Sequence, residues 1–283
     1  MLATYVIGLR EGLEAALIVG IVAAFLGRRD RRDALRQVWL GVLGAVLLCV
    51  GVAVALHVVS AELPTRQQEG LETVVALLAV AMVTSMILWM RRHARALKGE
   101  LEAQAASALA TGSAFALVAM AFLAVLREGF ETAVFVLAVL QQPGNQALPA
   151  GAGVFLGLAT AVAVGWGIYR GGVRLNLGRF FRATGVVLVV VAAGLVMSAL
   201  HTAHEAGWLD AGQATPLDLT WLVRPGTPLA ALLTGVLGIQ PRPAIAEILG
   251  WLVYLVPMLV VVLWPQRRRP APVRASAPVP TTR

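Results

Sequence analysis

Charged residues are scarce in this chain of 283 residues: Asp, Glu, Lys and Arg make up 13% of it, about half of the share found in soluble domains. Hydrophobic residues make up 59% of the chain. They occur in runs long enough for membrane helices, each of which needs roughly 20 apolar residues to cross the hydrocarbon core. This composition excludes a soluble globular protein. The net charge of +8 does not indicate nucleic-acid binding, because the basic residues lie between the apolar runs, where membrane topology requires them.

Cysteine is almost absent, and the single residue of this type, Cys49, lies inside an apolar run. An intrachain disulfide is therefore excluded. The beginning of the chain also lacks the positively charged region of a secretory signal, and its first apolar run contains Arg10, Glu11 and Glu14. A signal sequence would not tolerate these charges, so we expect a retained first helix.

The apolar runs predict an all-α polytopic membrane protein with seven transmembrane helices. The runs cover about residues 2–27, 38–60, 72–90, 112–140, 151–169, 183–203 and 245–264.

Basic residues are distributed unevenly between the connections of these helices. Alternate connections and the tail hold 18 of the 23 Lys and Arg residues, whereas the opposite connections hold only Arg66, Arg224 and Arg242. Since positive charge accumulates on the cytoplasmic side, we expect the N-terminus outside and the C-terminus inside. The basic residues of the predicted cytoplasmic side are Arg28, Arg29, Arg31, Arg32, Arg36, Arg91, Arg92, Arg95, Lys98, Arg170, Arg174, Arg179, Arg182, Arg267, Arg268, Arg269, Arg274 and Arg283.

The predicted organisation has two units of three helices followed by a seventh helix. The long extracytoplasmic loop contains an apolar run, 229–237, that is too short to span and is expected to be interfacial or re-entrant. The tail is rich in Pro, Arg and Ala and is predicted to be a disordered cytoplasmic segment near anionic headgroups. The expected divisions are 1–98 and 112–204 for the two units, 99–111 for a cytoplasmic connector, 205–244 for the loop, 245–264 for the last helix and 265–283 for the tail.

Two short segments of the chain resemble each other. Residues 9–16 read LREGLEAA and residues 126–133 read LREGFETA. Each segment belongs to the first helix of a three-helix unit, so the second unit crosses the membrane with opposite polarity. This predicts an inverted-topology repeat, an arrangement in which transport sites lie near the bilayer midplane.

The repeated segments place six ionisable side chains inside membrane helices. Unpaired, they would together cost on the order of 15–20 kcal/mol, more than the roughly 5–15 kcal/mol by which folded proteins are stable. At 100° per residue, the Arg and the two Glu residues of each segment share one helix face, while Gly12 and Gly129 are expected to allow close helix approach. The six residues are Arg10, Glu11, Glu14, Arg127, Glu128 and Glu131.

Meeting of the two faces would create a site with four carboxylates and two guanidinium groups, with a net charge of −2 when all are ionised. Oxygen ligands of this kind suit hard cations. Two other interpretations remain open at this level: an Arg–Glu network that only holds helices together, and an anion site built on the arginines.

The residues of these two segments resemble the high-affinity iron permeases, the oxidase-dependent or Efe-type transporters of the iron/lead transporter superfamily. The resemblance rests on Arg10-Glu11-Gly12-Leu13-Glu14 and Arg127-Glu128-Gly129-Phe130-Glu131 and covers roughly residues 1–264. It implies that the four motif glutamates bind the iron being moved, with the two arginines as essential neighbours. It also implies a partner such as a multicopper oxidase or a periplasmic cupredoxin-type or peroxidase-type protein, although direct uptake of iron stays open.

A second group of polar residues is a candidate entrance site at the outer ends of the helices. Residues 68–72 read QEGLE, which echoes the motif without its arginine. The His and Glu residues near the end of the sixth run have spacings of three and four, so they share one helix face. The alternatives are a solvated helix N-terminus for the first pair of glutamates and ordinary interfacial polar residues for the His and Glu residues of the sixth run. Glu247 is a weaker candidate for the same path. The candidate entrance residues are Glu69, Glu72, His201, His204 and Glu205.

The sequence thus predicts a membrane permease that imports iron, Fe³⁺ or Fe²⁺, by alternating access, and not an enzyme. No permanent cofactor and no nucleic-acid partner are expected; iron is the substrate and the lipid bilayer the surroundings. Transport of lead or manganese, and a sensor or subunit that does not transport, are the alternatives. The arginine-rich tail and the lack of an organellar address predict a bacterial inner membrane.

Overall fold

The computed structural model describes residues 1–28, 32–93, 114–142, 146–170, 176–215, 217–223, 227, 230, 233–234 and 237–264. Within this part of the chain the structure is helical and contains no strand. Its helices are α1 (Leu2–Arg28), α2 (Arg32–Glu62), α3 (Thr65–His93), α5 (Ala114–Leu140), α6 (Ala147–Tyr169), α7 (Leu177–Glu205) and α9 (Ile245–Leu263). The predicted connector 99–111 and the predicted tail 265–283 lie outside the described residues.

Each helix corresponds to one of the apolar runs, which confirms the all-helical prediction. The largest differences are at three N-terminal ends: α2, α3 and α7 begin at Arg32, Thr65 and Leu177, about six residues before the apolar runs. Polar residues can continue a membrane helix beyond the hydrocarbon core because they lie in the headgroup region. At the start of α7, the Asn176 side chain accepts a hydrogen bond from the Arg179 backbone N–H at 3.1 Å, which satisfies a free donor of the first turn.

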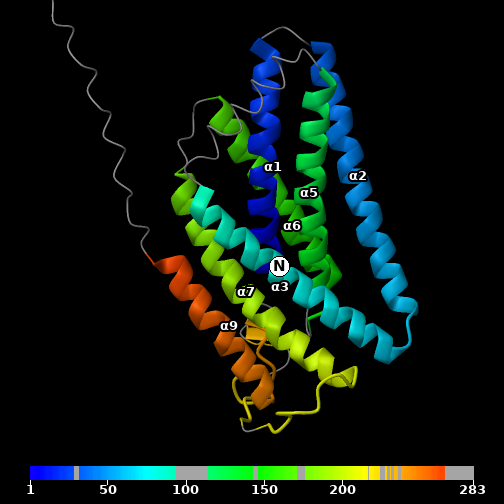
Figure 1. Cartoon of the computed structure of the whole chain (residues 1–283), viewed down its shortest axis with the longest axis vertical. Helices are drawn as coiled ribbons and strands as arrows, with labels where there is room; N and C mark the ends of the chain where they lie inside the picture. The colour runs from blue at the N-terminus through cyan, green and yellow to red at the C-terminus, as the bar shows by residue number, and fades with distance from the viewer. Residues whose placement is uncertain are drawn as a thin grey trace, which may run out of the picture.

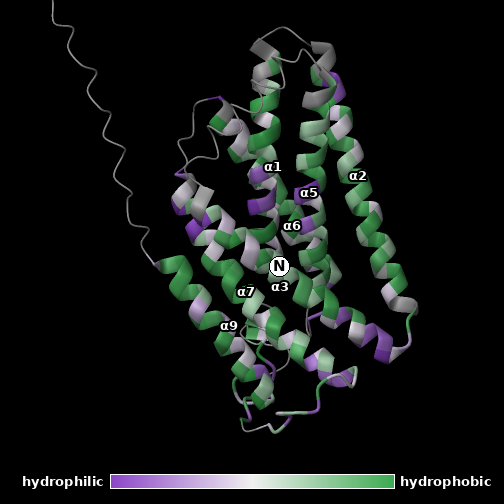
Figure 2. Cartoon of the chain, in the orientation of Figure 1, coloured by the Kyte–Doolittle hydropathy of each residue, from purple (hydrophilic) through white to green (hydrophobic). Residues whose placement is uncertain are grey.

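Five of these helices are long and apolar enough to cross a membrane, by length and composition. They are α2, α3, α6, α7 and α9. The other two, α1 and α5, are the helices that carry the repeated motifs. Figure 2 shows hydrophilic turns part of the way along α1 and α5, between hydrophobic turns on both sides.

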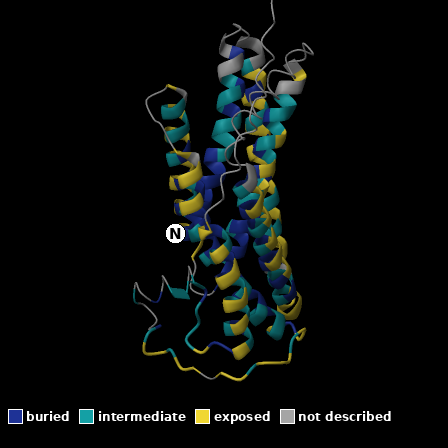
Figure 3. Cartoon of the chain, turned by 60° about the vertical axis from the view of Figure 1, so that its left-hand side comes forward, coloured by how far each residue is buried: buried dark blue, intermediate teal, exposed yellow. Residues whose placement is uncertain are grey.

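The helices pack in pairs that join the two halves of the chain. The closest pairs are α1 with α6, α2 with α5, and α3 with α7, and α1 also packs on α5 (Figure 1). Helix α9 packs mainly on α7. The largest apolar core joins residues of α1, α3, α5, α7 and α9, and the outer faces of helices such as α2 are largely exposed (Figure 3). Apolar exposed faces of this kind are what a helix presents to lipid.

Glycines allow the very close approach of α1 and α6. A Cβ atom at Gly8 would lie 2.7 Å from the Val154 carbonyl oxygen, and one at Gly157 would lie 2.6 Å from the Leu9 backbone nitrogen. Both contacts are with backbone, which cannot move aside as a side chain can. This pair of helices therefore depends on small residues at its interface, as membrane helix pairs commonly do.

The segment between α7 and α9 also approaches the middle of α7. Gly238 has a φ of 69°, which favours glycine, and a Cβ at Gly194 would lie 2.8 Å from the Leu237 carbonyl carbon. Gly194 lies 11 residues before Glu205, the last residue of α7, a distance of about 16 Å along the helix. The predicted re-entrant run 229–237 lies only partly within the described residues, and its role stays a prediction.

Candidate functional site

The two repeated motifs face each other inside the bundle, on α1 and α5. Arg10 and Glu11 are each 1% exposed, and Glu128 is 7% exposed. Glu11, Glu128 and Glu131 each offer a carboxylate oxygen, and these oxygens lie within 4.8 Å of one another. Among the described residues, this is the one group of three metal-binding side chains that meets that distance. Three of the four motif glutamates therefore have carboxylate oxygens close together, one from α1 and two from α5.

The motif glycines explain how the helices present their acidic faces to each other. A Cβ at Gly12 would lie 2.8 Å from Leu158 Cδ2 of α6, and one at Gly129 would lie 2.7 Å from Cys49 Sγ of α2. The glycine is two residues after the arginine, or about 200° around the helix. Close approach at the glycines thus occurs with α6 and α2, which leaves the opposite faces free to meet at the α1–α5 interface.

Glu14 belongs to the same site through its arginine. Arg10 Nε lies 3.4 Å from Glu14 Oε1, across one turn of α1. The charge of Glu14 also interacts with those of Glu128 and Glu131. Glu14 is not one of the three residues whose oxygens form the closest group, so its place as a ligand stays a prediction.

The two arginines of the site have different surroundings. Arg10 is buried, and its guanidinium carbon lies 5.8 Å from the centre of the Phe181 ring of α7. The Arg127 side chain is 64% exposed and its Nε lies 3.1 Å from Glu131 Oε1 and 3.9 Å from Glu128 Oε1. Each arginine therefore pairs with the glutamate four residues later in its own helix, as the motif predicted.

Several buried polar atoms of the site have no hydrogen-bond partner within the described residues. They are both carboxylate oxygens of Glu11, Oε1 of Glu14, and Nε and Nη1 of Arg10. A buried charged group without a partner costs several kcal/mol. Arg10 Nε and Glu14 Oε1 still form an ion pair at 3.4 Å, so the acceptors left without any partner among the described residues are the two oxygens of Glu11. A cation held against them would supply the missing interaction, so the carboxylate oxygens present fit a metal ion.

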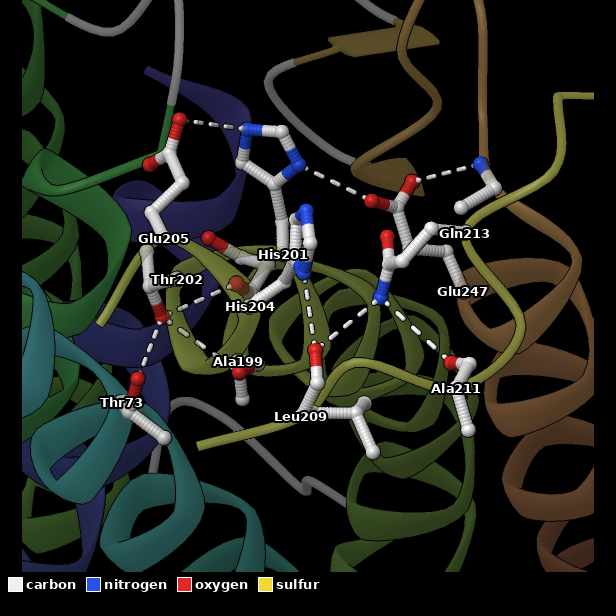
Figure 4. A network of polar contacts seen from close by, with 12 residues as sticks. Thr73, Ala199, His201, Thr202, His204, Glu205, Leu209, Ala211, Gln213 and Glu247 are labelled. Atoms are coloured by element: carbon white, nitrogen blue, oxygen red, sulfur yellow. Dashed lines mark hydrogen bonds and ion pairs between the residues drawn. The ribbon is translucent and has the colours of Figure 1, made fainter. Parts of the chain in front are cut away.

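A second polar cluster lies where α3, α7 and α9 meet, and we call it the His201 cluster (Figure 4). His201 Nδ1 lies 2.9 Å from Glu247 Oε1, and His201 Nε2 lies 3.5 Å from Glu205 Oε1. Two glutamates of α3 lie beside them: the carboxyl group of Glu69 is within hydrogen-bonding reach of that of Glu205, and the charge of Glu72 interacts with both. The cluster thus consists of Glu69, Glu72, His201, Glu205 and Glu247.

The structure brings together four of the five predicted entrance residues. The fifth, His204, contacts the backbone instead, since its Nδ1 lies 2.8 Å from the Leu209 carbonyl oxygen (Figure 4). Glu247 has a larger part in the cluster than the sequence indicated. Its signal was an acidic residue in the first turn of a helix, and the structure shows that its Oε2 also accepts from the Ala244 backbone N–H at 3.2 Å.

Helix α7 ends directly after the cluster, which fixes the positions of His201 and Glu205 in its last turns. Gly207 has a φ of 76° and donates to the His204 carbonyl oxygen, while the Trp208 N–H donates to Ala203, both at 2.8 Å. These two bonds are a Schellman motif, in which glycine ends a helix. Nearby, the Thr73 and Thr202 hydroxyls lie 2.7 Å apart and join α3 to α7.

Comparison with known proteins identifies the family of this chain. The chain is 41% identical over 269 residues to the ferrous iron permease EfeU of Escherichia coli O157:H7, covering 94% of this chain and 97% of the relative. The same values hold for the protein of that name from Escherichia coli O6:K15:H31, and the Yersinia pestis protein is 39% identical over 269 residues, covering 94% and 95%. No solved structure shows a significant match. Since residues 1–267 match the pattern of the Iron permease FTR1 family, the chain belongs to that family of membrane transporters.

Proposed function

We propose that the chain imports iron through the carboxylate site formed by the two motifs. The observation that carries this proposal is the convergence of Glu11, Glu128 and Glu131, whose oxygens lie within 4.8 Å of one another in a buried position. Glu14 is the fourth ligand, and Arg10 and Arg127 are supporting residues that reduce repulsion between the carboxylates when no ion is bound. The site contains only oxygen donors, which suits a hard or borderline cation.

An inverted repeat of two three-helix units supports transport by alternating access. Exchanging α1 with α5, α2 with α6 and α3 with α7 converts the α1–α6 pair into the α5–α2 pair. The α3–α7 and α1–α5 pairs are converted into themselves, and the α3–α5 contact becomes α1–α7. The motif glycines follow the same correspondence: Gly12 of α1 contacts α6, and Gly129 of α5 contacts α2, the counterpart of α6. These correspondences in packing support a pseudo-symmetric pair of units that rock around a shared site.

Seven membrane crossings with the N-terminus outside fit the same arrangement. The end of α1 and the start of α2 lie at one end of the bundle, and the described part of the 206–244 segment lies at the opposite end (Figure 1). The arginine-rich sequences belong with the first end, so we assign this end to the cytoplasm. The His201 cluster then lies on the outer side of a bacterial inner membrane.

Ferrous iron is the first candidate for the substrate, because the similar proteins are named ferrous iron permeases. Oxygen ligands alone do not distinguish Fe²⁺ from Mn²⁺, so manganese and lead are competing substrates to be measured. A separate extracytoplasmic protein that oxidises or delivers iron is part of the proposal.

Uptake of radiolabelled iron into liposomes tests the proposal. Ferrous iron under reducing conditions and ferric citrate are supplied separately to liposomes that contain the wild type, Glu11→Gln or Glu128→Gln. Each substitution keeps the size of the side chain and removes its charge, so we expect uptake to fall at least about 100-fold, the change that roughly 2.7 kcal/mol produces. Asp218→Asn, which alters an exposed carboxylate near Arg242, is the control and keeps full uptake.

Unchanged uptake in both glutamine variants would overturn the carboxylate site. Binding of iron by the wild type without any flux would instead identify a sensor or subunit.

A further inference from the structure

The His201 cluster joins helices from both halves of the chain and from α9, which has no counterpart in the repeat. His201 and Glu205 are on α7, Glu69 and Glu72 on α3, and Glu247 on α9. The ring of His201 lies between two carboxylates, one at each of its nitrogens (Figure 4). The two carboxylates differ in burial, because the Glu247 side chain is 4% exposed and that of Glu205 is 46% exposed.

The buried carboxylate determines which nitrogen of His201 carries hydrogen. An ionised carboxylate accepts hydrogen bonds and cannot donate them, so at 2.9 Å His201 Nδ1 must be the donor to Glu247. The other oxygen of Glu247 is held by the Ala244 backbone N–H. This leaves Nε2 as the nitrogen with a free lone pair in the neutral ring. A histidine that binds metal commonly has this arrangement, with its second nitrogen donating to a carboxylate behind it.

The free nitrogen faces a second ligand at a distance that suits a shared ion. His201 Nε2 and Glu205 Oε1 are 3.5 Å apart, and two ligands about 2.1 Å from one metal at a tetrahedral angle are about 3.4 Å apart. A neutral imidazole nitrogen and a carboxylate oxygen would repel each other here, because both present lone pairs. This repulsion is removed by a cation between them, by a protonated imidazolium ring, or by a proton on the Glu205 carboxyl group.

We propose that His201 Nε2, Glu205 and Glu69 form a loading site for a divalent transition-metal cation, with Glu247 as the residue that positions His201. This inference rests on the proposed function, since it assigns the entrance of the same path. Two ligand atoms of this site, His201 Nε2 and Glu205 Oε1, already lie close together. The partly buried Glu69, whose carboxyl group is near that of Glu205, supplies the third by a turn of its side chain toward His201.

The motif site and the loading site differ in ligand chemistry, so the loading site can distinguish ions that the motif site would accept equally. The motif site offers only carboxylate oxygens, which also suit Mg²⁺ and Ca²⁺. An imidazole ligand suits iron and its neighbours in the first transition row and is a poor ligand for Mg²⁺ and Ca²⁺. The loading site therefore selects the ion before it reaches the carboxylates of α1 and α5.

Pulsed EPR with Mn²⁺ on the tag-free, full-length protein in nanodiscs tests this site without requiring transport. We expect the wild type to show ¹⁴N coupling from a directly bound imidazole. His201→Ala loses that coupling and one bound ion per chain, whereas Glu11→Gln keeps the coupling. His204→Ala is the matched control, because it removes an imidazole from the same end of α7 that contacts backbone instead, and it keeps the coupling.

Glu247 requires a separate test, because a change at this position can also disturb α9. Glu247→Leu removes the acceptor for Nδ1 and is expected to weaken Mn²⁺ binding at the loading site about 10- to 100-fold, the usual effect of losing such a partner. Glu247→Gln retains an acceptor oxygen and restores most of the affinity, while binding at the motif site is unchanged in both variants. Equal loss in both variants would contradict the positioning role.

Absence of ¹⁴N coupling in the wild type would overturn the loading site, and a proton on His201 or Glu205 would then be what joins the two residues. Coupling that persists in His201→Ala would overturn it as well. Neither result bears on uptake by the motif site, so the failure of this proposal and the failure of the transport proposal are distinguishable.

Discussion

The two motifs have almost the same sequence and different surroundings. Arg10 is 1% exposed and lies against Phe181, whereas the Arg127 side chain is 64% exposed. Arg127 instead lines an apolar hollow between α2 and α5, together with Cys49 and Phe130. If the two motifs belong to the proposed inverted repeat, two halves in the same state would bury both arginines equally. The arginine of the α1 motif is thus enclosed by protein and that of the α5 motif is not, an asymmetry of the kind that the proposed alternating access requires.

Replacing each arginine in turn should give the largest contrast between the two halves. Arg10→Met leaves the charge of Glu14 buried without its partner and is expected to lower the free energy of unfolding by about 3–5 kcal/mol. Arg127→Met should lose less than half of that, because its ion pair is largely exposed. Thermal unfolding of the two variants in the same detergent measures the difference, and equal losses would show that the two environments are alike.

The motif glycines offer a smaller contrast with an internal control. Gly12→Ala places a Cβ 2.9 Å from Ala161 Cβ, and Gly129→Ala places one 2.7 Å from Cys49 Sγ. Overpacking of this kind typically costs about 1–3 kcal/mol. Cys49→Ala should restore the stability of Gly129→Ala, because it removes the colliding sulfur, and it should have no effect on Gly12→Ala. Rescue of both variants would contradict the pairing of Gly129 with α2.

Chemical labelling of introduced cysteines compares how accessible the two arginine positions are to water. In a Cys49→Ala background, Arg127→Cys should react with a membrane-impermeant thiol reagent about tenfold faster or more than Arg10→Cys. The factor follows if the Arg10 side opens only in a minor state populated at about 10% or less. A rate for Arg127→Cys as slow as that for Arg10→Cys would show that the Arg127 side faces lipid rather than a water-filled opening.

Much of the fold was readable from the sequence, because long apolar runs have few alternatives. The ends of the helices were predicted within about six residues, and the spacing of Glu11 and Glu14 correctly gave the face that meets α5. Helical spacing does not say which neighbour a face meets, however. The partners of Gly12 and Gly129, the burial of Arg10 and the contact of His204 with backbone therefore became visible only in the structure.

The contacts of Glu247 likewise could not be predicted from helical spacing. From the sequence Glu247 was only a weaker candidate for the entrance path, and the structure shows that it also accepts from the Ala244 N–H at the start of α9. Its second contact, with His201, joins residues 46 positions apart in the chain. No local pattern encodes such a pair, since it depends on how α9 packs against α7.

The contact between Gly194 and Gly238 has a mechanical consequence for the whole assembly. With no side chain at either position, the backbone after Leu237 lies directly against the middle of α7, and α9 follows and packs on the same helix. The chain just before α9 is therefore fixed to the middle of α7 at Leu237 and Gly238, so a substitution that adds a side chain at Gly194 would push both residues away from α7. Helix α9 is therefore tied to α7 in two ways, by direct packing and through the backbone at Leu237 and Gly238.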